Sequence, residues 1–115
     1  MPMTNYLANQ IGNATLTGTT YTSPSAWYAS LYSTAPTANT SGTELTGNGY
    51  SRQLTTFSVS TGNGQATNSA NVTFGAATGN AWAPVVAFAV VDASSSGNIL
   101  YYGNVTPVQT VTVGD

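Results

Sequence analysis

The segment PVVAFAVVD, residues 84–92, decides how this chain folds. Its apolar residues follow one another without the alternation that marks a strand with one face in water. A short continuous apolar run of this kind is typical of a strand covered on both faces. The segment therefore predicts the central strand of a sheet.

Shorter strands are predicted on both sides of this run, because β-branched and aromatic residues stand there between clusters of Gly, Pro, Asn and Ser. The predicted strands are WYASLYS (27–33), RQLTTFSVS (52–60), NSANVTF (68–74), ILYYGNV (99–105) and QTVTV (109–113). Thr61-Gly62-Asn63-Gly64 favours a hairpin between the second and third of these strands, because Asn-Gly tolerates positive φ. ASSSGN (93–98) is expected to be a loop.

The alternation of side chains predicts which residues of these strands point inward. Trp27 and Leu31 share one face of the first strand, and Tyr28 and Tyr32 share the other. In RQLTTFSVS, Leu54, Phe57 and Val59 are expected inside. Alternate residues of a regular strand share a face, but Leu54 and Phe57 are three positions apart. The change of face between them predicts a β-bulge near Thr55-Thr56.

Only the N-terminal segment is predicted to be helical. Its apolar residues at helical spacing are Leu7, Ile11 and Ala14. Thr4 or Asn5 can cap the start, and we expect the helix to cover Thr4 to about Asn13. With strands from about residue 26 onward and no linker, the chain is predicted to be one domain, residues 1–115. The expected fold is mainly β, a small antiparallel sandwich or barrel with one N-terminal α-helix.

Charged residues make up 3% of the chain, against about 25% in a typical domain. Arg52 is the one basic residue, and the carboxylates are Glu44, Asp92 and Asp115. One cation cannot neutralise the phosphates that nucleic-acid binding requires, nor form a polybasic membrane anchor. No apolar run reaches the roughly 20 residues of a membrane-spanning helix. We therefore expect no nucleic-acid or membrane partner. The low net charge favours association, so a homo-oligomer is expected.

The chain lacks the side chains on which most catalytic and metal sites depend. It has no His, Cys or Lys, so its hydroxyls have no evident base to activate them. Transition-metal cages are excluded for the same reason. We expect no enzyme, no cofactor and no metal site. Asp92 is expected to close a turn by bonding the backbone of Ser94 or Ser95. The N-terminus also lacks the basic region of a signal peptide, which predicts no export by the general secretory route.

Glu44 and Arg52 lie eight positions apart around Gly47-Asn48-Gly49. One interpretation is an ion pair that braces this turn within the chain. The other is that Arg52 reaches a carboxylate or carbonyl of a neighbouring subunit, since its planar guanidinium binds such groups in a bidentate manner.

Tyr28, Tyr32 and Tyr50 are the candidate interface aromatics. Tyr side chains are favoured at interfaces because they bury a large area at low entropic cost. Alternatively, these residues form a second layer of the core, with both faces of the sheet covered.

Four motifs in a fixed order resemble a family of small virion proteins of tailed bacteriophages. They are GTELTGNGYSRQLTTFS, NSANVTFGAATGNAW, VVAFAVVDASSSGNILYYGNVTP and VTVGD. The positions that match the family pattern are Gly42, Glu44, Tyr50, Arg52, Gln53, Val72 to Phe74, Trp82, Asp92, Ala93, Gly97, Asn98, Leu100, Tyr102 and Gly103. The chain departs from this pattern at Val91, where the family often has Phe. It also stops at VTVGD, so the last strand is expected to be open to a partner.

The resemblance implies a structural role in a virion that assembles in the host cytoplasm. Proteins of this family are often described as tail fibre proteins, while similar small β proteins act as capsid cement. We expect a capsid cement or decoration protein that contacts the major capsid protein or other virion proteins. The alternative is a tail fibre or adhesin component that contacts the host surface.

Overall fold

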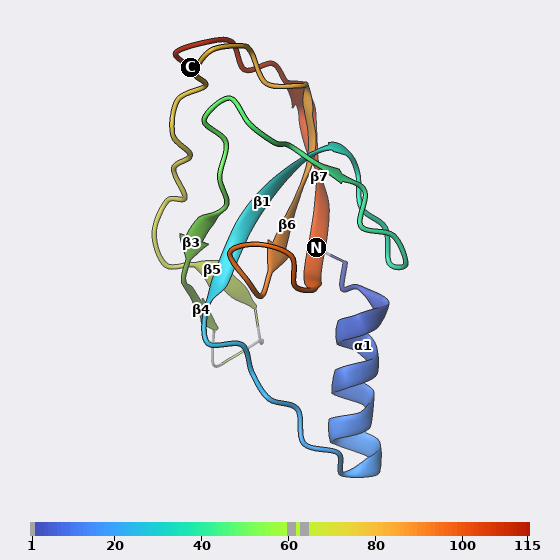
Figure 1. Cartoon of the computed structure of the whole chain (residues 1–115). Coiled ribbons are helices and arrows are strands. Elements are labelled where there is room, and N and C mark those ends of the chain that lie inside the picture. Colours follow the sequence, from blue (N-terminus) through green and yellow to red (C-terminus); the bar gives the residue numbers. More distant parts are fainter. Residues whose placement is uncertain (1, 60–61, 63–64) are drawn as a thin grey trace.

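A computed structural model of the chain describes residues 2–59, 62 and 65–115. Its main sheet has the strand order β2-β1-β6-β7, and β3 also pairs with β1 (Figure 1). The strands are β1 (Trp27–Thr34), β2 (Thr43–Glu44), β3 (Gln53–Thr55), β6 (Val85–Val91) and β7 (Ile99–Gln109). All these pairs are antiparallel. The predicted central strand is confirmed, because β6 lies between β1 and β7.

β6 is largely buried: Val85, Ala87, Ala89, Val90 and Val91 are buried, whereas Val86 and Phe88 are half-buried. One face belongs to a buried cluster of Tyr32, Ala87, Ala89 and Val91. At its start, β6 joins a second buried cluster of Leu45, Ala77, Trp82 and Val85. The segment between β2 and β3 supplies Leu45 to the second cluster, and the segment between β5 and β6 supplies Ala77 and Trp82, so long irregular segments carry part of the core.

The predicted strand RQLTTFSVS is split between two sheets. Its first part is β3, and its second part is β4 (Phe57–Val59), which pairs with β5 (Ala66–Asn68) in a separate two-stranded sheet. The predicted bulge is wrong, because the chain leaves the main sheet at Thr56. The expected inward positions change with it: Leu54 is 63% exposed, Val59 is 63% exposed, and Thr55 is buried.

Two further strand predictions are wrong in position. The strand expected at residues 68–74 lies at Ala66–Asn68 instead, and no strand covers residues 69–74. Likewise β7 ends at Gln109, so QTVTV is not a strand beyond its first residue. Residues 69–74 and 110–113 are instead irregular segments. Their backbone groups bond to other loops: the carbonyl of Val111, for example, accepts the Trp82 N–H at 3.0 Å. The turn expected at residues 61–64 lies largely outside the described residues, although the strands before and after it do pair.

The N-terminal helix is longer than predicted. It comprises α1 (Asn5–Gly12) and a π-helical turn, η1 (Asn13–Thr17), and ends at Gly18 with φ of +77°. Thr4 caps α1 by accepting the Leu7 N–H. The hydroxyl of Thr17 donates to the Asn13 carbonyl at 2.8 Å within this turn.

The fold class is therefore confirmed: the chain is mainly β, with antiparallel sheets and one N-terminal helical segment. The described strands do not close into a barrel. The structure is elongated, with principal extents of 49, 28 and 25 Å. Within the described residues, no helix is both long enough and apolar enough to cross a bilayer.

Candidate functional site

The GNG turn brings Tyr50 back against the main sheet. Gly47, Asn48 and Gly49 all have positive φ, and the Tyr50 N–H donates to the Gly47 carbonyl at 3.0 Å. A Cβ at Gly49 would lie 2.8 Å from the carbonyl oxygen of Ala76, so only glycine fits there. Three successive residues of this conformation reverse the chain within a very short span.

The Tyr50 hydroxyl fills a gap in the hydrogen bonding of β1. On the edge of β1 away from β6, β3 pairs with residues 27–29 and β2 with residues 32–34. Leu31 lies between them. Its N–H donates to the Tyr50 hydroxyl at 3.0 Å, and its carbonyl accepts the Leu45 N–H at 3.0 Å. A side chain thus takes the place of a missing strand residue.

The same hydroxyl donates to Glu44, which in turn holds Arg52. We call Glu44, Tyr50 and Arg52 the Glu44 cluster. Tyr50 donates to Oε2 of Glu44 at 2.6 Å, and Arg52 donates through Nε to Oε2 at 2.9 Å and through Nη2 to Oε1 at 2.8 Å. The side chains of Arg52 and Glu44 are 11% and 24% exposed. The ion pair expected within the chain is therefore present, and its geometry is bidentate.

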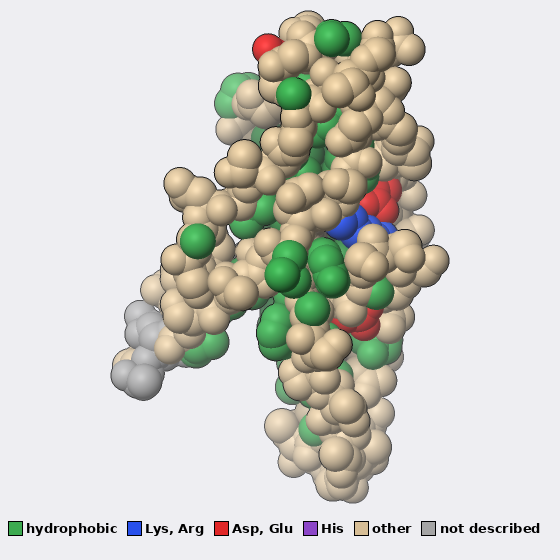
Figure 2. Space-filling model, turned by 60° about the vertical axis from the view of Figure 1, so that its left-hand side comes forward, with side chains coloured by type: hydrophobic (Ala, Val, Ile, Leu, Met, Phe, Trp, Pro, Cys, Tyr) green, Lys and Arg blue, Asp and Glu red, His purple; other side chains and the backbone are tan. Residues whose placement is uncertain are grey.

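Arg52 also fixes the loop after β6. Its Nη1 donates to the carbonyls of Ala93 and Ser96, at 2.8 Å each. Arg52 thus joins the turn after β2 to the β6–β7 loop. In Figure 2 the blue side chain, which is Arg52 because the chain has no other Lys or Arg, is partly covered by neutral groups and has red carboxylate side chains near it.

Asp92 closes that loop, although not with the predicted partner. Its Oδ1 accepts the Asn98 N–H at 2.7 Å, rather than a bond from Ser94 or Ser95. Gly97 has φ of +77°, and a Cβ there would lie 2.5 Å from Oδ1 of Asp92. The loop is wider than a simple Asx turn because Gly97 can adopt this conformation directly against the carboxylate.

Burial and hydrogen bonding have opposite effects on the Glu44 carboxyl. Burial alone would raise its pKa, but the hydrogen bonds from Arg52 and Tyr50 are stronger and hold the pKa below its ordinary value. Burial, with the bond to Glu44, raises the pKa of Tyr50 well above that of a free tyrosine. The cluster therefore keeps Glu44 ionised and Tyr50 protonated near neutral pH. The donors of Tyr50 and Arg52 already bond to groups of the same chain, so the cluster is suited to holding the segment after β2 against β1 and the β6–β7 loop.

A protein-family model described as "Podophage GP4 fiber I protein gp80" matches residues 2–115. The chain belongs to this family. It is therefore a structural protein of a bacteriophage virion. The resemblance to small phage virion proteins is confirmed, and the match spans the whole described fold. A search of curated proteins gave no match.

In this member of the fibre family, the candidate aromatics occupy different environments. Tyr32 is 2% exposed and lies in the core, so it is not an interface residue on this chain. Ser30 donates to its hydroxyl at 3.1 Å. Tyr28 is half-buried and packs against the same cluster. The second-layer interpretation therefore describes Tyr32, whereas part of the Tyr28 side chain stays exposed.

Tyr50 also belongs to an aromatic group that no sequence pattern predicts. The Tyr50 ring stacks on Phe74 at 6.1 Å between centroids and meets Trp82 edge-on at 5.7 Å. The Trp82 indole N–H donates to the Asn48 carbonyl at 2.8 Å. The family pattern contains both Tyr50 and Trp82, but nothing in their spacing indicates that they touch.

Among the described residues, no group of three or more His, Cys, Asp and Glu side chains lies close enough together to hold a metal ion.

Proposed function

We propose that this protein is a non-enzymatic component of a virion fibre and acts through contacts with other virion proteins. The observation that carries the proposal is the match of the fibre family along residues 2–115. The elongated shape, with a helix that projects from one end of the sheet, suits a subunit of an extended assembly (Figure 1).

The state of the charged side chains supports a role without catalysis. Glu44 is bonded to Arg52 and Tyr50, Asp92 to Asn98, and Asp115 to Thr112. The chain has no His, Cys or Lys to act as a base or nucleophile. Binding energy is then the one means by which such a chain acts on another molecule.

The partners that follow from this proposal are further copies of the chain and neighbouring proteins of the virion, joined during assembly in the host cytoplasm. An exterior of hydroxyl and amide groups offers many hydrogen bonds and little repulsion between copies. A fibre that contacts the host surface would use the same neutral groups for recognition.

Capsid cement or decoration is the second candidate, with the major capsid protein as partner. It is favoured by the small size and the low charge of the chain, because many copies of a small subunit gain strength by multivalency. Here the contacts would lie over joints of the shell.

Cryo-electron microscopy of the virion that carries this protein tests the proposal. Density for this fold in an appendage of the tail, at a copy number set by the tail symmetry, is the expected result. Hundreds of copies on the head would reject the fibre and favour cement. Substrate turnover by the purified protein would contradict both candidates.

A further inference from the structure

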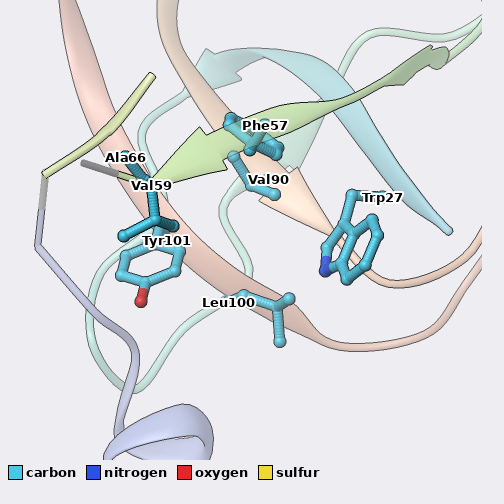
Figure 3. A pocket seen from close by; sticks show the side chains of 7 residues that line it. All are labelled: Trp27, Phe57, Val59, Ala66, Val90, Leu100 and Tyr101. Atoms are coloured by element: carbon cyan, nitrogen blue, oxygen red, sulfur yellow. The ribbon is translucent and has the colours of Figure 1, made fainter. Parts of the chain in front are cut away.

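An apolar groove lies between the main sheet and the small β4–β5 sheet. Its volume is about 520 Å³, within the ~300–1,000 Å³ range typical of ligand sites. The side chains that line it include Trp27, Phe57, Val59, Val90, Leu100 and Tyr101 (Figure 3). None of the lining residues is charged. An open groove of aromatic and aliphatic side chains is the kind of surface that marks an interaction site, and it favours an apolar occupant.

The N-terminal helix supplies an apolar surface without a partner in the same chain. We call residues 5–17, which comprise α1 and η1, the helical arm. The arm is anchored at its start, where Leu7 is buried and the Thr4 hydroxyl donates to the Ile99 carbonyl at 2.6 Å. Beyond this anchor Ile11 is 38% exposed and Leu16 is 86% exposed. The arm projects away from the sheet (Figure 1).

The arm does not enter the groove of its own chain, since no arm residue lines the groove in the described structure. Figure 2 shows the arm and the β4–β5 sheet as two projections with a notch between them, where hydrophobic side chains gather. A projecting arm with exposed apolar side chains and an unfilled apolar groove give one chain two surfaces through which identical copies can associate.

We propose that the groove receives the helical arm of a second copy of this chain, with Leu16 and Ile11 as the anchoring side chains. The match is one of chemistry: neither the arm nor the groove contains any of the four charged residues of the chain. Because residues 5–17 carry no charged side chain, the arm can enter the groove in any orientation about its axis without desolvating a charge.

This inference rests on the proposed function, because it names one contact through which copies would join in the assembly. Each copy gives one arm and receives one. If two chains exchange arms reciprocally the result is a closed dimer, and if the exchange passes from chain to chain it is a ring or filament.

Sedimentation of the purified chain over a range of concentrations measures this association. Leu16→Ser and Val59→Ser are each expected to weaken it by about tenfold or more, because each removes one apolar side chain from the contact. The matched controls are Leu54→Ser and Val113→Ser, at 63% and 57% exposure and outside the groove, which should leave it unchanged. Circular dichroism checks that each variant is folded.

Disulfide cross-linking identifies the partner surface. Because the chain has no Cys of its own, the introduced Cys residues are the only ones that can form a disulfide. Chains carrying Leu16→Cys are mixed with chains carrying Val59→Cys and oxidised, and mass spectrometry identifies the linked peptides. The expected product joins residue 16 of one chain to residue 59 of another. A monomeric wild-type chain, or a link formed only within a doubly substituted chain, would overturn the inference. Neither result bears on where the protein lies in the virion, which the particle reconstruction tests separately.

Discussion

Arg52 donates to Glu44 through Nε and Nη2, while its Nη1 donates to two carbonyls of the β6–β7 loop, more than forty residues away in sequence. One side chain thus connects the β2 end of the sheet to the β6–β7 loop. The contact is largely shielded from solvent, with Arg52 only 11% exposed, so it differs from an ordinary surface ion pair.

Arg52→Ala should lower the free energy of unfolding by about 3 kcal/mol, because it leaves the Glu44 carboxylate shielded and without its cation. Urea denaturation measures this effect. Gln53→Ala is the neighbouring control, since within the described residues the amide of Gln53 bonds only Ser51, in an exposed position, and should matter little. A fully stable Arg52→Ala chain that no longer assembles would instead favour a contact with a neighbouring subunit.

The stability of the protein should fall in acid because of Glu44. The pKa of this carboxyl is lower in the folded chain than the ~4.3 of an unfolded one. Its contribution is therefore complete above about pH 4.3 and is lost as pH falls through the lower folded pKa. Denaturation between pH 7 and pH 2 should show this loss, and Glu44→Gln should flatten the curve. Asp115→Asn separates the smaller effect of the exposed Asp115, whose pKa is lowered by its bonds to Thr112.

Tyr50→Phe should destabilise the chain by about 1–2 kcal/mol, because the Leu31 N–H and Glu44 both lose a partner away from bulk water. Hydrogen exchange at the Leu31 amide should become faster than at its neighbours in β1. Tyr28→Phe is the matched control, since the Tyr28 ring packs on the core but its hydroxyl makes no hydrogen bond in the described structure. Equal effects of the two substitutions would contradict the role assigned to the Tyr50 hydroxyl.

Gly97→Ala should cost about 2–3 kcal/mol, since it combines a strained φ with a clash against Asp92. Gly47→Ala separates these causes, because Gly47 has φ of +69° but open space around its Cβ position. We expect only about 1 kcal/mol at Gly47. Thermal unfolding of both variants measures the difference, and equal losses would show that the contact with Asp92 is unimportant.

The parts of the fold that could be predicted are those set by local pattern. The unbroken apolar run at Val85–Val91 identifies a central strand, and Thr4 identifies the start of a helix. The alternation at residues 68–74 was misleading, because alternation also suits an extended segment that packs through one residue, as Phe74 does on Tyr50. Where RQLTTFSVS divides depends on which strand each half pairs with, and that is a tertiary property.

The candidate site was predictable in part for a related reason. Opposite charges at Glu44 and Arg52 around a glycine turn suggest an ion pair from spacing alone. The bonds from Tyr50 to Leu31 and from Arg52 to Ala93 depend on how β1 and β6 are placed, which no local pattern contains. The same limit explains why Tyr32 was a candidate for an interface, although it is buried.

The inward position of Arg52 has a physical consequence for any assembly of these chains. With its single cation engaged inside the fold, the molecule offers almost no exposed charge for dissolved ions to screen. Contacts between copies should therefore keep their strength from dilute buffer to concentrated brine. Apolar contacts weaken near freezing, so the particle should be more sensitive to cold than to ionic strength.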